Sequence, residues 1–250
     1  MLHDKDIREP LFEFLEEIYP VNRTIEEKRM GRSRADAVMV TPDSIYGIEI
    51  KSDADTYARL ASQVKDYDLY FDFNFVVVGT SHALHIEEHV PEYWGIITVE
   101  YTEDSEQPED SEQPEDSEQP EDSKQLQRIE SMKESSKTKT IDFYMLRYPK
   151  KNPNVSWERK MSMLWRPEMA HIQELNGMHA YKQKSKLFVL MKILEKVPYD
   201  ILQTQICAEL MERDYSTISE RIYEYRKANA RPGKTVRRKK KRKKYKVLIK

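Results

Sequence analysis

RADAVMVTPDSIYGIEIKSDADTYARLASQVKDY, residues 34–67, is the stretch that decides the fold. It contains two short apolar segments, 37–40 and 45–51, separated by Thr-Pro-Asp-Ser. Proline presets φ, and Asp and Ser side chains can bond their own backbone, so this tetrapeptide favours a tight bend. β-Branched residues are frequent in both segments, which is typical of strands. The stretch therefore predicts a β-hairpin.

The hairpin gathers three ionisable side chains on one patch of sheet. Side chains of a strand alternate between faces, so Glu49 and Lys51 share one face while Ile48 and Ile50 take the other. The bend brings Asp36 to the same patch. Two carboxylates can hold Mg²⁺ or Mn²⁺ for phosphodiester hydrolysis, and an ammonium group can orient the water or stabilise developing charge. The alternative is a surface hairpin with an ordinary Glu–Lys salt bridge.

A helix is predicted over residues 56–71. The preceding segment, SDAD at 52–55, supplies an N-cap and an acidic first turn. On the helix, Gln63 and Tyr67 lie one turn apart, and Arg59 lies one turn before them. The three side chains share a face, so the helix can add them to the patch on the hairpin.

These residues resemble the PD-(D/E)XK superfamily of restriction-endonuclease-like nucleases, in the form that carries a QxxxY helix after E-x-K. In that family the Asp and Glu bind the metal, the Lys assists the attacking water, and the Gln and Tyr line the site. The resemblance implies these roles for Asp36, Glu49, Lys51, Gln63 and Tyr67, with the backbone carbonyl of Ile50 as a further metal ligand.

The resemblance extends beyond the motif. The segments GIEIKSDADTYARLASQ, VPEYWGI and LWRPEM are similar to a group of bacterial and phage proteins within the superfamily. The similarity covers residues 5–100 and, more thinly, 157–225. The proline of the family name is absent, because Ala35 precedes Asp36, but that position is commonly relaxed.

Other residues are candidates for the same site. The superfamily often has another metal-facing Glu upstream of the Asp, and Glu13 and Glu26 are the candidates here. Arg32, Arg34 and Arg59 could seat DNA phosphates, because Arg forms bidentate bonds to them. A solvated carboxylate and ordinary exposed charge are the respective alternatives.

The predicted fold class is α/β, with a mixed central sheet flanked by helices and a small all-α C-terminal domain. A helical stripe over 6–19 precedes the hairpin, and segments 73–79 and 95–99 predict further strands. Helical patterns then cover 157–175, 187–197 and 201–212, and Thr217 offers a capping box for a last helix. The expected parts are a nuclease-like domain (1–101), a linker (102–139), a helical domain (140–230) and a tail (231–250).

The linker and the tail have opposite charge. An acidic hexapeptide, EDSEQP, repeats between 103 and 120, which predicts a disordered spacer; mimicry of DNA is the alternative. The tail is expected to be disordered and to bind nucleic acid in a salt-sensitive way, although anionic lipid or a nuclear address would suit it too. Its cations are Arg237, Arg238, Lys239, Lys240, Lys241, Arg242, Lys243 and Lys244.

Several classes of protein are excluded or disfavoured. The single cysteine, Cys207, permits no internal disulfide and fits a reducing cytoplasm. No apolar run approaches the ~18 residues of a membrane span. His85 and His89 match the H-x-x-E-H zinc signature, but Pro91 follows at once, so surface histidines are the preferred interpretation.

The sequence thus predicts a Mg²⁺- or Mn²⁺-dependent deoxyribonuclease that acts in the cytoplasm. The alternative is a catalytically inactive nucleic-acid-binding or regulatory protein that keeps the nuclease fold. A helix-turn-helix joined by residues 213–216 could serve such a protein, although short helix pairs are more often simple packing. A DNA-binding regulator centred on residues 199–228 is a third hypothesis.

Overall fold

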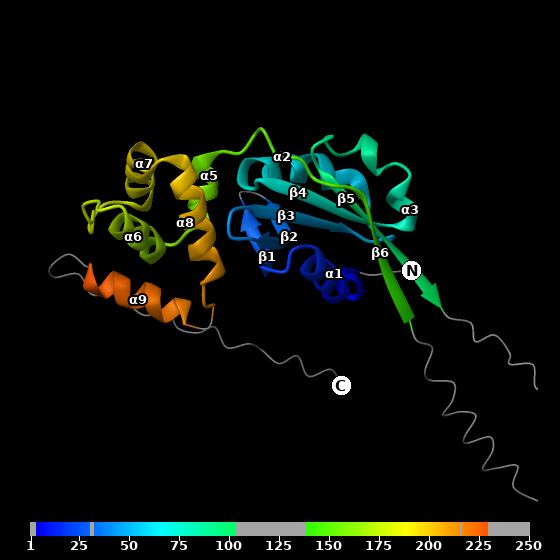
Figure 1. Ribbon diagram of the computed structural model, residues 1–250, viewed down its shortest axis with the longest axis horizontal. Helices are drawn as coiled ribbons and strands as arrows, with labels where there is room; N and C mark the ends of the chain where they lie inside the picture. Colours follow the sequence, from blue (N-terminus) through cyan, green and yellow to red (C-terminus); the bar gives the residue numbers. More distant parts are fainter. Residues whose placement is uncertain (1–3, 31–32, 104–138, 216, 230–250) are drawn as a thin grey trace, which may run out of the picture.

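A computed structural model describes residues 4–30, 33–103, 139–215 and 217–229 (Figure 1). The described strands form one six-stranded sheet in the order β1-β2-β3-β4-β5-β6. The strands are β1 (Arg23–Met30), β2 (Ser33–Val40), β3 (Ile45–Lys51), β4 (Phe73–Gly79), β5 (Gly95–Glu103) and β6 (Lys139–Arg147). The first three strands and the last pair are antiparallel, whereas β3, β4 and β5 run parallel. The predicted mixed sheet is confirmed.

Helices cover both faces of the sheet. Helix α1 (Asp4–Ile18) buries Ile7, Leu11 and Leu15 against one face, which confirms the helical stripe predicted for 6–19. Helix α2 (Leu60–Tyr70), preceded by the 3₁₀ turn η1 (Tyr57–Arg59), covers the other face. Strand β4 lies between them and is apolar on both sides, as the sequence predicted. Burial of one such valine stabilises the fold by about 1.5–3 kcal/mol.

A glycine allows α2 to lie close to β3. A Cβ added to Gly47 would lie 2.2 Å from Cδ2 of Phe71 and 2.6 Å from Cδ1 of Tyr67. Any larger residue at position 47 would therefore push α2 away from the sheet. This close approach determines how far the ring of Tyr67 lies from β3.

A helical module continues the core on the α2 side, to the left in Figure 1. Its helices are α5 (Trp157–Ser162), α6 (Arg166–Leu175), α7 (Lys186–Lys196), α8 (Tyr199–Met211) and α9 (Ile218–Ala228). The module is joined to the sheet by a buried ion pair between Lys160 on α5 and Asp72 before β4, and Gln203 of α8 bonds to both residues. The predicted C-terminal helices are thus confirmed, and they pack in the same core cluster as α2.

The structure differs from the sequence-based predictions at several elements. Strands β1 and β6 were not predicted, and the pairing of β6 with β5 brings residues assigned to the helical domain into the sheet. The pattern 157–175 forms two helices, because Pro167 starts the first turn of α6. Two predicted caps are wrong. Asp55 accepts bonds from Ser52, and Thr217 makes no side-chain cap bond to α9.

None of the described helices combines the length and the apolar composition that a membrane crossing requires. The short helix α3 (Thr80–Ala83) and the 3₁₀ turn η2 (Ile86–Glu88) connect β4 to β5. His85 and His89 flank this turn and are exposed, and the ring of His89 packs 4.1 Å from that of Tyr57. No long helix presents the two histidines as a zinc pair, which agrees with the preferred interpretation.

Candidate active site

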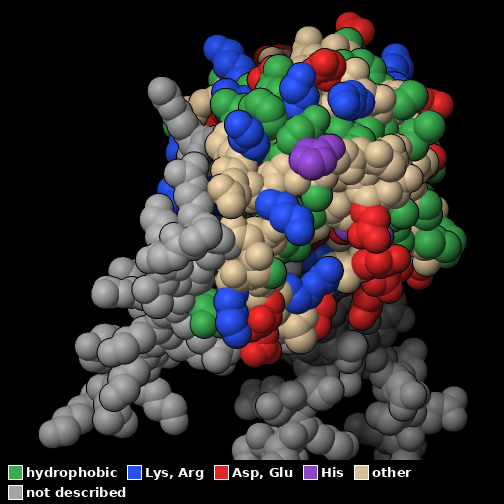
Figure 2. Space-filling model, turned by 90° about the vertical axis from the view of Figure 1, so that its left-hand side faces the viewer, with side chains coloured by type: hydrophobic (Ala, Val, Ile, Leu, Met, Phe, Trp, Pro, Cys, Tyr) green, Lys and Arg blue, Asp and Glu red, His purple; other side chains and the backbone are tan. Residues whose placement is uncertain are grey.

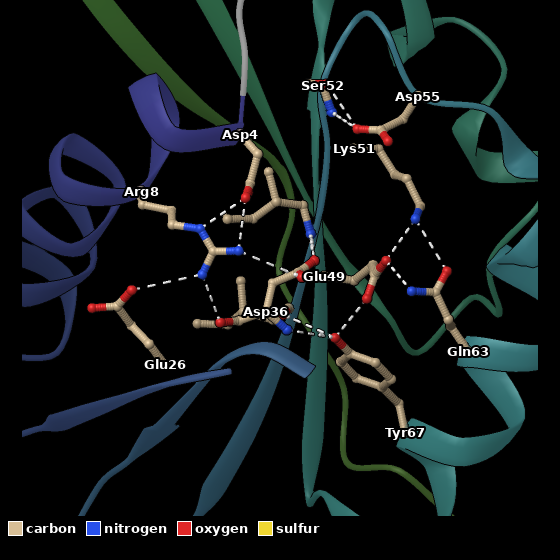
Figure 3. A network of polar contacts seen from close by, with 12 residues as sticks. Asp4, Arg8, Glu26, Asp36, Glu49, Lys51, Ser52, Asp55, Gln63 and Tyr67 are labelled. Atoms are coloured by element: carbon tan, nitrogen blue, oxygen red, sulfur yellow. Dashed lines mark hydrogen bonds and ion pairs between the residues drawn. The ribbon is translucent and has the colours of Figure 1, made fainter. Parts of the chain in front are cut away.

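The structure brings the five predicted catalytic residues into one network of polar contacts (Figure 3). Strand β2 supplies Asp36, β3 supplies Glu49 and Lys51, and α2 supplies Gln63 and Tyr67. The register of the hairpin explains this, because the described β2–β3 pairs begin at Ala37↔Ile48, one position from Asp36 and Glu49.

Glu49 lies at the centre of the network and is almost fully buried. Its Oε1 lies 2.6 Å from the Nζ of Lys51 and also accepts a bond from Nε2 of Gln63. Nζ in turn donates to Oε1 of Gln63 at 3.0 Å. Glu49, Lys51 and Gln63 therefore form a closed triangle of hydrogen bonds, which fixes the rotamers of all three side chains.

Tyr67 holds the other oxygen of the same carboxylate. Its hydroxyl lies 2.6 Å from Oε2 of Glu49 and 3.0 Å from the carbonyl oxygen of Ile48. Burial, together with the charges of Glu49 and Asp36, raises the pKa of Tyr67 well above its usual value. The phenol therefore stays protonated and acts as a fixed donor beneath the site.

Asp36 has a carboxyl group whose pKa is raised far above its usual value. Burial is the main cause that raises its pKa to about 7, and the charge of Glu49 adds to the effect. The N–H of Ile50 donates to Oδ2 of Asp36 at 2.9 Å and opposes the shift. A carboxylate with a pKa shifted this far, next to a second carboxylate, is typical of a functional site.

Two residues that the sequence analysis missed complete this side of the site. Arg8 of α1 donates to the main-chain oxygen of Asp36 at 2.9 Å, and its Nη2 lies 3.6 Å from Oδ1 of Asp36. Asp4 holds the same guanidinium through two bonds, of 2.9 and 2.8 Å. The i, i+4 spacing of Asp4 and Arg8 predicts their own pair, but nothing in the sequence connects that pair to Asp36.

Of the two candidate upstream metal ligands, only Glu26 lies near the network. Glu26 on β1 reaches Nη1 of Arg8 at 3.7 Å, so it faces the same guanidinium as Asp36. Glu13 is exposed on α1. The structure thus brings Glu26 to the edge of the network through Arg8 and leaves Glu13 with no role at the site.

The donor set fits a hard divalent cation. In the described part of the chain, no group of three or more His, Cys, Asp and Glu side chains is arranged to hold a metal ion. Mg²⁺, however, keeps several waters and is usually held by one or two carboxylates, which Asp36 and Glu49 can provide. The N–H of Ile50 points to Asp36, and its carbonyl points the same way because both groups of a strand residue face the same neighbour.

A basic pocket of about 540 Å³ opens beside the network. Asp36 and Gln63 line it together with Arg34 and Arg59, which the sequence predicted to contact phosphate. Lys65 is a third cation on its wall and was missed, because its position on α2 carries no motif. Asp66 also lines the pocket, so its cations outnumber its carboxylates by one. The pocket therefore combines the acidic site with a surface that attracts phosphate. Arg32 and residues 237–244 lie outside the described part of the chain.

The two helices proposed as a helix-turn-helix are α8 and α9, and their connection is anchored to α6. Arg213 in the turn is fully buried and binds Glu168 of α6 at 2.7 Å. Figure 2 shows the end of the molecule formed by the helical module, where Lys and Arg side chains are scattered among neutral ones and acidic side chains gather along one side. This charge distribution gives no specific support to a DNA-reading helix, which stays a prediction.

The comparisons with known proteins identify the family of the chain. The family model described as Bacteriophage P4 protein cII matches residues 2–237. No curated protein and no solved structure matches the chain. Because the match spans most of its length, the chain belongs to the bacteriophage P4 protein cII family.

Proposed function

For this member of the bacteriophage P4 protein cII family, we propose the activity of a Mg²⁺-dependent nuclease that hydrolyses phosphodiester bonds of DNA; Mn²⁺ is expected to replace Mg²⁺. The observation that carries the proposal is the network around Glu49. One carboxylate is fixed by Lys51, Gln63 and Tyr67, next to the desolvated carboxylate of Asp36. The resemblance of these residues to the PD-(D/E)XK pattern supports the same conclusion.

Asp36, Glu49 and the carbonyl of Ile50 are the groups that would hold the cation. When bound, a divalent cation lowers the pKa of a coordinated water and neutralises charge on the scissile phosphate. The ionised form of Asp36 is needed for this role, since a protonated carboxyl group binds cations poorly. Tyr67 keeps Glu49 in one orientation by donating to Oε2.

Lys51 is the residue proposed to act on the nucleophile and the phosphate. Its ammonium group is held between Glu49 and Gln63, so it stays in place without the substrate. From there it can orient the attacking water and stabilise the negative charge that develops on the phosphate oxygens. Gln63 lines the basic pocket and binds both partners of the ion pair, so its amide links substrate position to Lys51.

DNA is the proposed partner. Arg34, Arg59 and Lys65 surround the approach to Asp36 and are suited to phosphate oxygens. The basic run 237–244 predicts additional salt-sensitive affinity that does not depend on sequence. Cys207 is buried and unpaired in the described structure, which fits the proposed location in the reducing cytoplasm.

One observation favours a second candidate, a binding protein without activity. Lys51 and Glu49 neutralise each other, and such a pair can persist for structural reasons alone. The test is incubation of the wild type and Lys51→Ala with single-stranded, duplex and branched DNA in Mg²⁺, Mn²⁺ or EDTA. Cleavage that needs the cation and is lost in the variant supports the nuclease. Binding of DNA by both proteins without cleavage would instead support the second candidate.

A further inference from the structure

Arg8 has contacts that go beyond neutralising a charge. Its Nη1 donates to the main-chain oxygen of Asp36, while Nε and Nη2 both donate to the carboxylate of Asp4. The side chain is only 13% exposed. We infer that Arg8 is a positioning residue, which fixes the backbone at Asp36 and thereby aims its carboxylate at the cation. This inference rests on the proposed function.

The position of Asp36 in the sheet explains why such support is needed. The described β2–β3 ladder runs from Val40↔Ile45 to Ala37↔Ile48, so Asp36 lies just past its end. Its carbonyl is held by Arg8 from α1, and its N–H lies 3.4 Å from the hydroxyl of Tyr67 on α2. Two helices on opposite faces of the sheet thus hold the main chain of one residue.

The carboxylate of Asp36 is then fixed by the main chain of the neighbouring strand, because the N–H of Ile50 donates to Oδ2. A planar guanidinium is suited to hold Asp4 and the carbonyl at once, since its donors have a fixed geometry. The ammonium of a lysine is a single point of charge on a flexible stem and cannot reproduce both contacts. Charge alone is therefore not the property that the site requires at position 8.

A second explanation of Arg8 is that it serves only as a counter-charge to the neighbouring carboxylates, and this explanation predicts the opposite effect on cation binding. Arg8 lies within ion-pair distance of the carboxylates of Asp4, Glu26 and Asp36. If Arg8 served only as a counter-charge, its removal would make the site more negative and would strengthen cation binding. A positioning role predicts weaker binding.

The experiment measures Mn²⁺ binding to the full-length protein without DNA, by the loss of the free-ion electron paramagnetic resonance signal. The variants are Arg8→Lys, Arg8→Gln and the control Arg23→Lys. Arg23 also donates to a main-chain carbonyl, that of Met211, at the joint with the helical module. We expect both Arg8 variants to bind Mn²⁺ about tenfold more weakly, as is typical when support of a ligand is lost. Arg23→Lys should bind as the wild type does.

Cleavage kinetics should show the same weakening of Mn²⁺ binding. The Mn²⁺ concentration for half-maximal cleavage should rise about tenfold in Arg8→Lys, while the KM for DNA stays unchanged. Melting temperatures of Arg8→Lys and Arg23→Lys report any general loss of stability, and a matching loss of Mn²⁺ binding in Arg23→Lys would overturn the inference.

Two further outcomes separate this inference from the proposed function. Unchanged Mn²⁺ binding in Arg8→Lys, or tighter binding in Arg8→Gln, would reduce Arg8 to a counter-charge and overturn its positioning role, provided that Asp36→Asn still loses binding. If the wild type and Asp36→Asn bind Mn²⁺ equally, both this inference and the proposed function fail.

Discussion

Lys51 and Lys160 are both buried, and each contacts one carboxylate and one glutamine whose amide also donates to that carboxylate. The partners are Glu49 and Gln63 for the first lysine, and Asp72 and Gln203 for the second. The first cluster joins β3 to α2, and the second joins the sheet to α5 and α8. A buried Lys–carboxylate–Gln cluster is therefore no sign of catalysis by itself, because this protein uses one at a structural joint.

The surroundings of the two clusters differ. Asp36, with its raised pKa, and a pocket lined by three cations lie beside Lys51. The pocket at the joint is slightly larger, about 590 Å³, and three aspartates line it together with Lys151 and Lys160. The Nζ of Lys160 lies 4.5 Å from the ring centroid of Trp157. Aspartates outnumber lysines on the wall of the pocket at the joint, whereas cations outnumber carboxylates in the pocket beside Lys51, so the latter pocket attracts phosphate more strongly. The proposed function of the first cluster therefore rests on its neighbours and not on pocket size.

Loss of one carboxylate charge in each cluster should give the largest contrast. Glu49→Gln is expected to lower kcat about 1000-fold, because several kcal/mol of transition-state stabilisation depend on a held cation. Asp72→Asn should leave kcat per folded molecule unchanged, although it weakens the fold. Single-turnover cleavage of labelled DNA, normalised to the folded fraction, measures both. Equal losses in the two variants would remove the distinction between the clusters.

Removal of each lysine should separate the two clusters by their effect on stability. Lys160→Met is expected to lower the free energy of unfolding by about 3–5 kcal/mol, because Asp72 stays buried without its cation. The kcat of the folded fraction should be unchanged, whereas that of Lys51→Met should be lost. Urea denaturation followed by circular dichroism gives the first quantity. A stable Lys160→Met protein would show that the joint does not depend on its ion pair.

The basic pocket can be compared with the joint by removing one cation from each. Arg59→Gln should weaken DNA binding and reduce the slope of log K against log salt by about 1, as expected for one lost phosphate contact. Lys151→Gln removes a charge from the pocket at the joint and should leave the slope unchanged. Fluorescence anisotropy in EDTA over a range of salt concentrations measures both slopes. Identical slopes in Arg59→Gln and the wild type would contradict the proposed path of the DNA.

The smallest expected effect is a dependence of stability on pH. The folded protein keeps a proton on Asp36 up to about pH 7, while the unfolded chain releases it near the usual value of 3.8. The folded state therefore binds more protons in this window, and the free energy of unfolding falls as pH rises from about 4 to 7. The slope has an upper limit of about 1.4 kcal/mol per pH unit, and partial exposure of Asp36 makes it smaller.

Denaturation in EDTA at pH 5 and pH 7 tests this dependence, with Asp36→Asn as the comparison. The wild type should lose about 1 kcal/mol more than the variant between the two pH values. If both proteins lose the same amount, Asp36 ionises normally and the site lacks the desolvation inferred from its burial.

Local sequence patterns predicted the residues around Glu49, but they could not predict the contact of Arg8 with Asp36. The alternation of Glu49 and Lys51 and the one-turn spacing of Gln63 and Tyr67 are properties of a single strand and a single helix, and the structure confirms both. The contact of Arg8 with Asp36 joins residues 28 positions apart and depends on how α1 packs. The second cluster depends on a contact between Gln203 and Asp72 across 131 positions. No periodicity encodes such pairings.

The fold was predictable to a similar extent. The hairpin and the apolar strand β4 have strong local signals, because one has turn chemistry and the other is apolar on both faces. Strand β1 is charged and has no alternating pattern that would reveal it, so its formation depends on pairing with β2. Strand β6 does have an alternating signal that was missed, because Ile141, Phe143 and Met145 all pack against the core. An edge strand such as β1 depends on its neighbour more than on its own composition.

Anomalous diffraction from crystals grown with Mn²⁺ tests the central claim most directly, because it locates the cation without assuming an activity. The account predicts one strong peak between Asp36, Glu49 and the carbonyl of Ile50, which disappears in Glu49→Gln. A site without such a peak at saturating Mn²⁺, or a peak beside Asp72 instead, would contradict it.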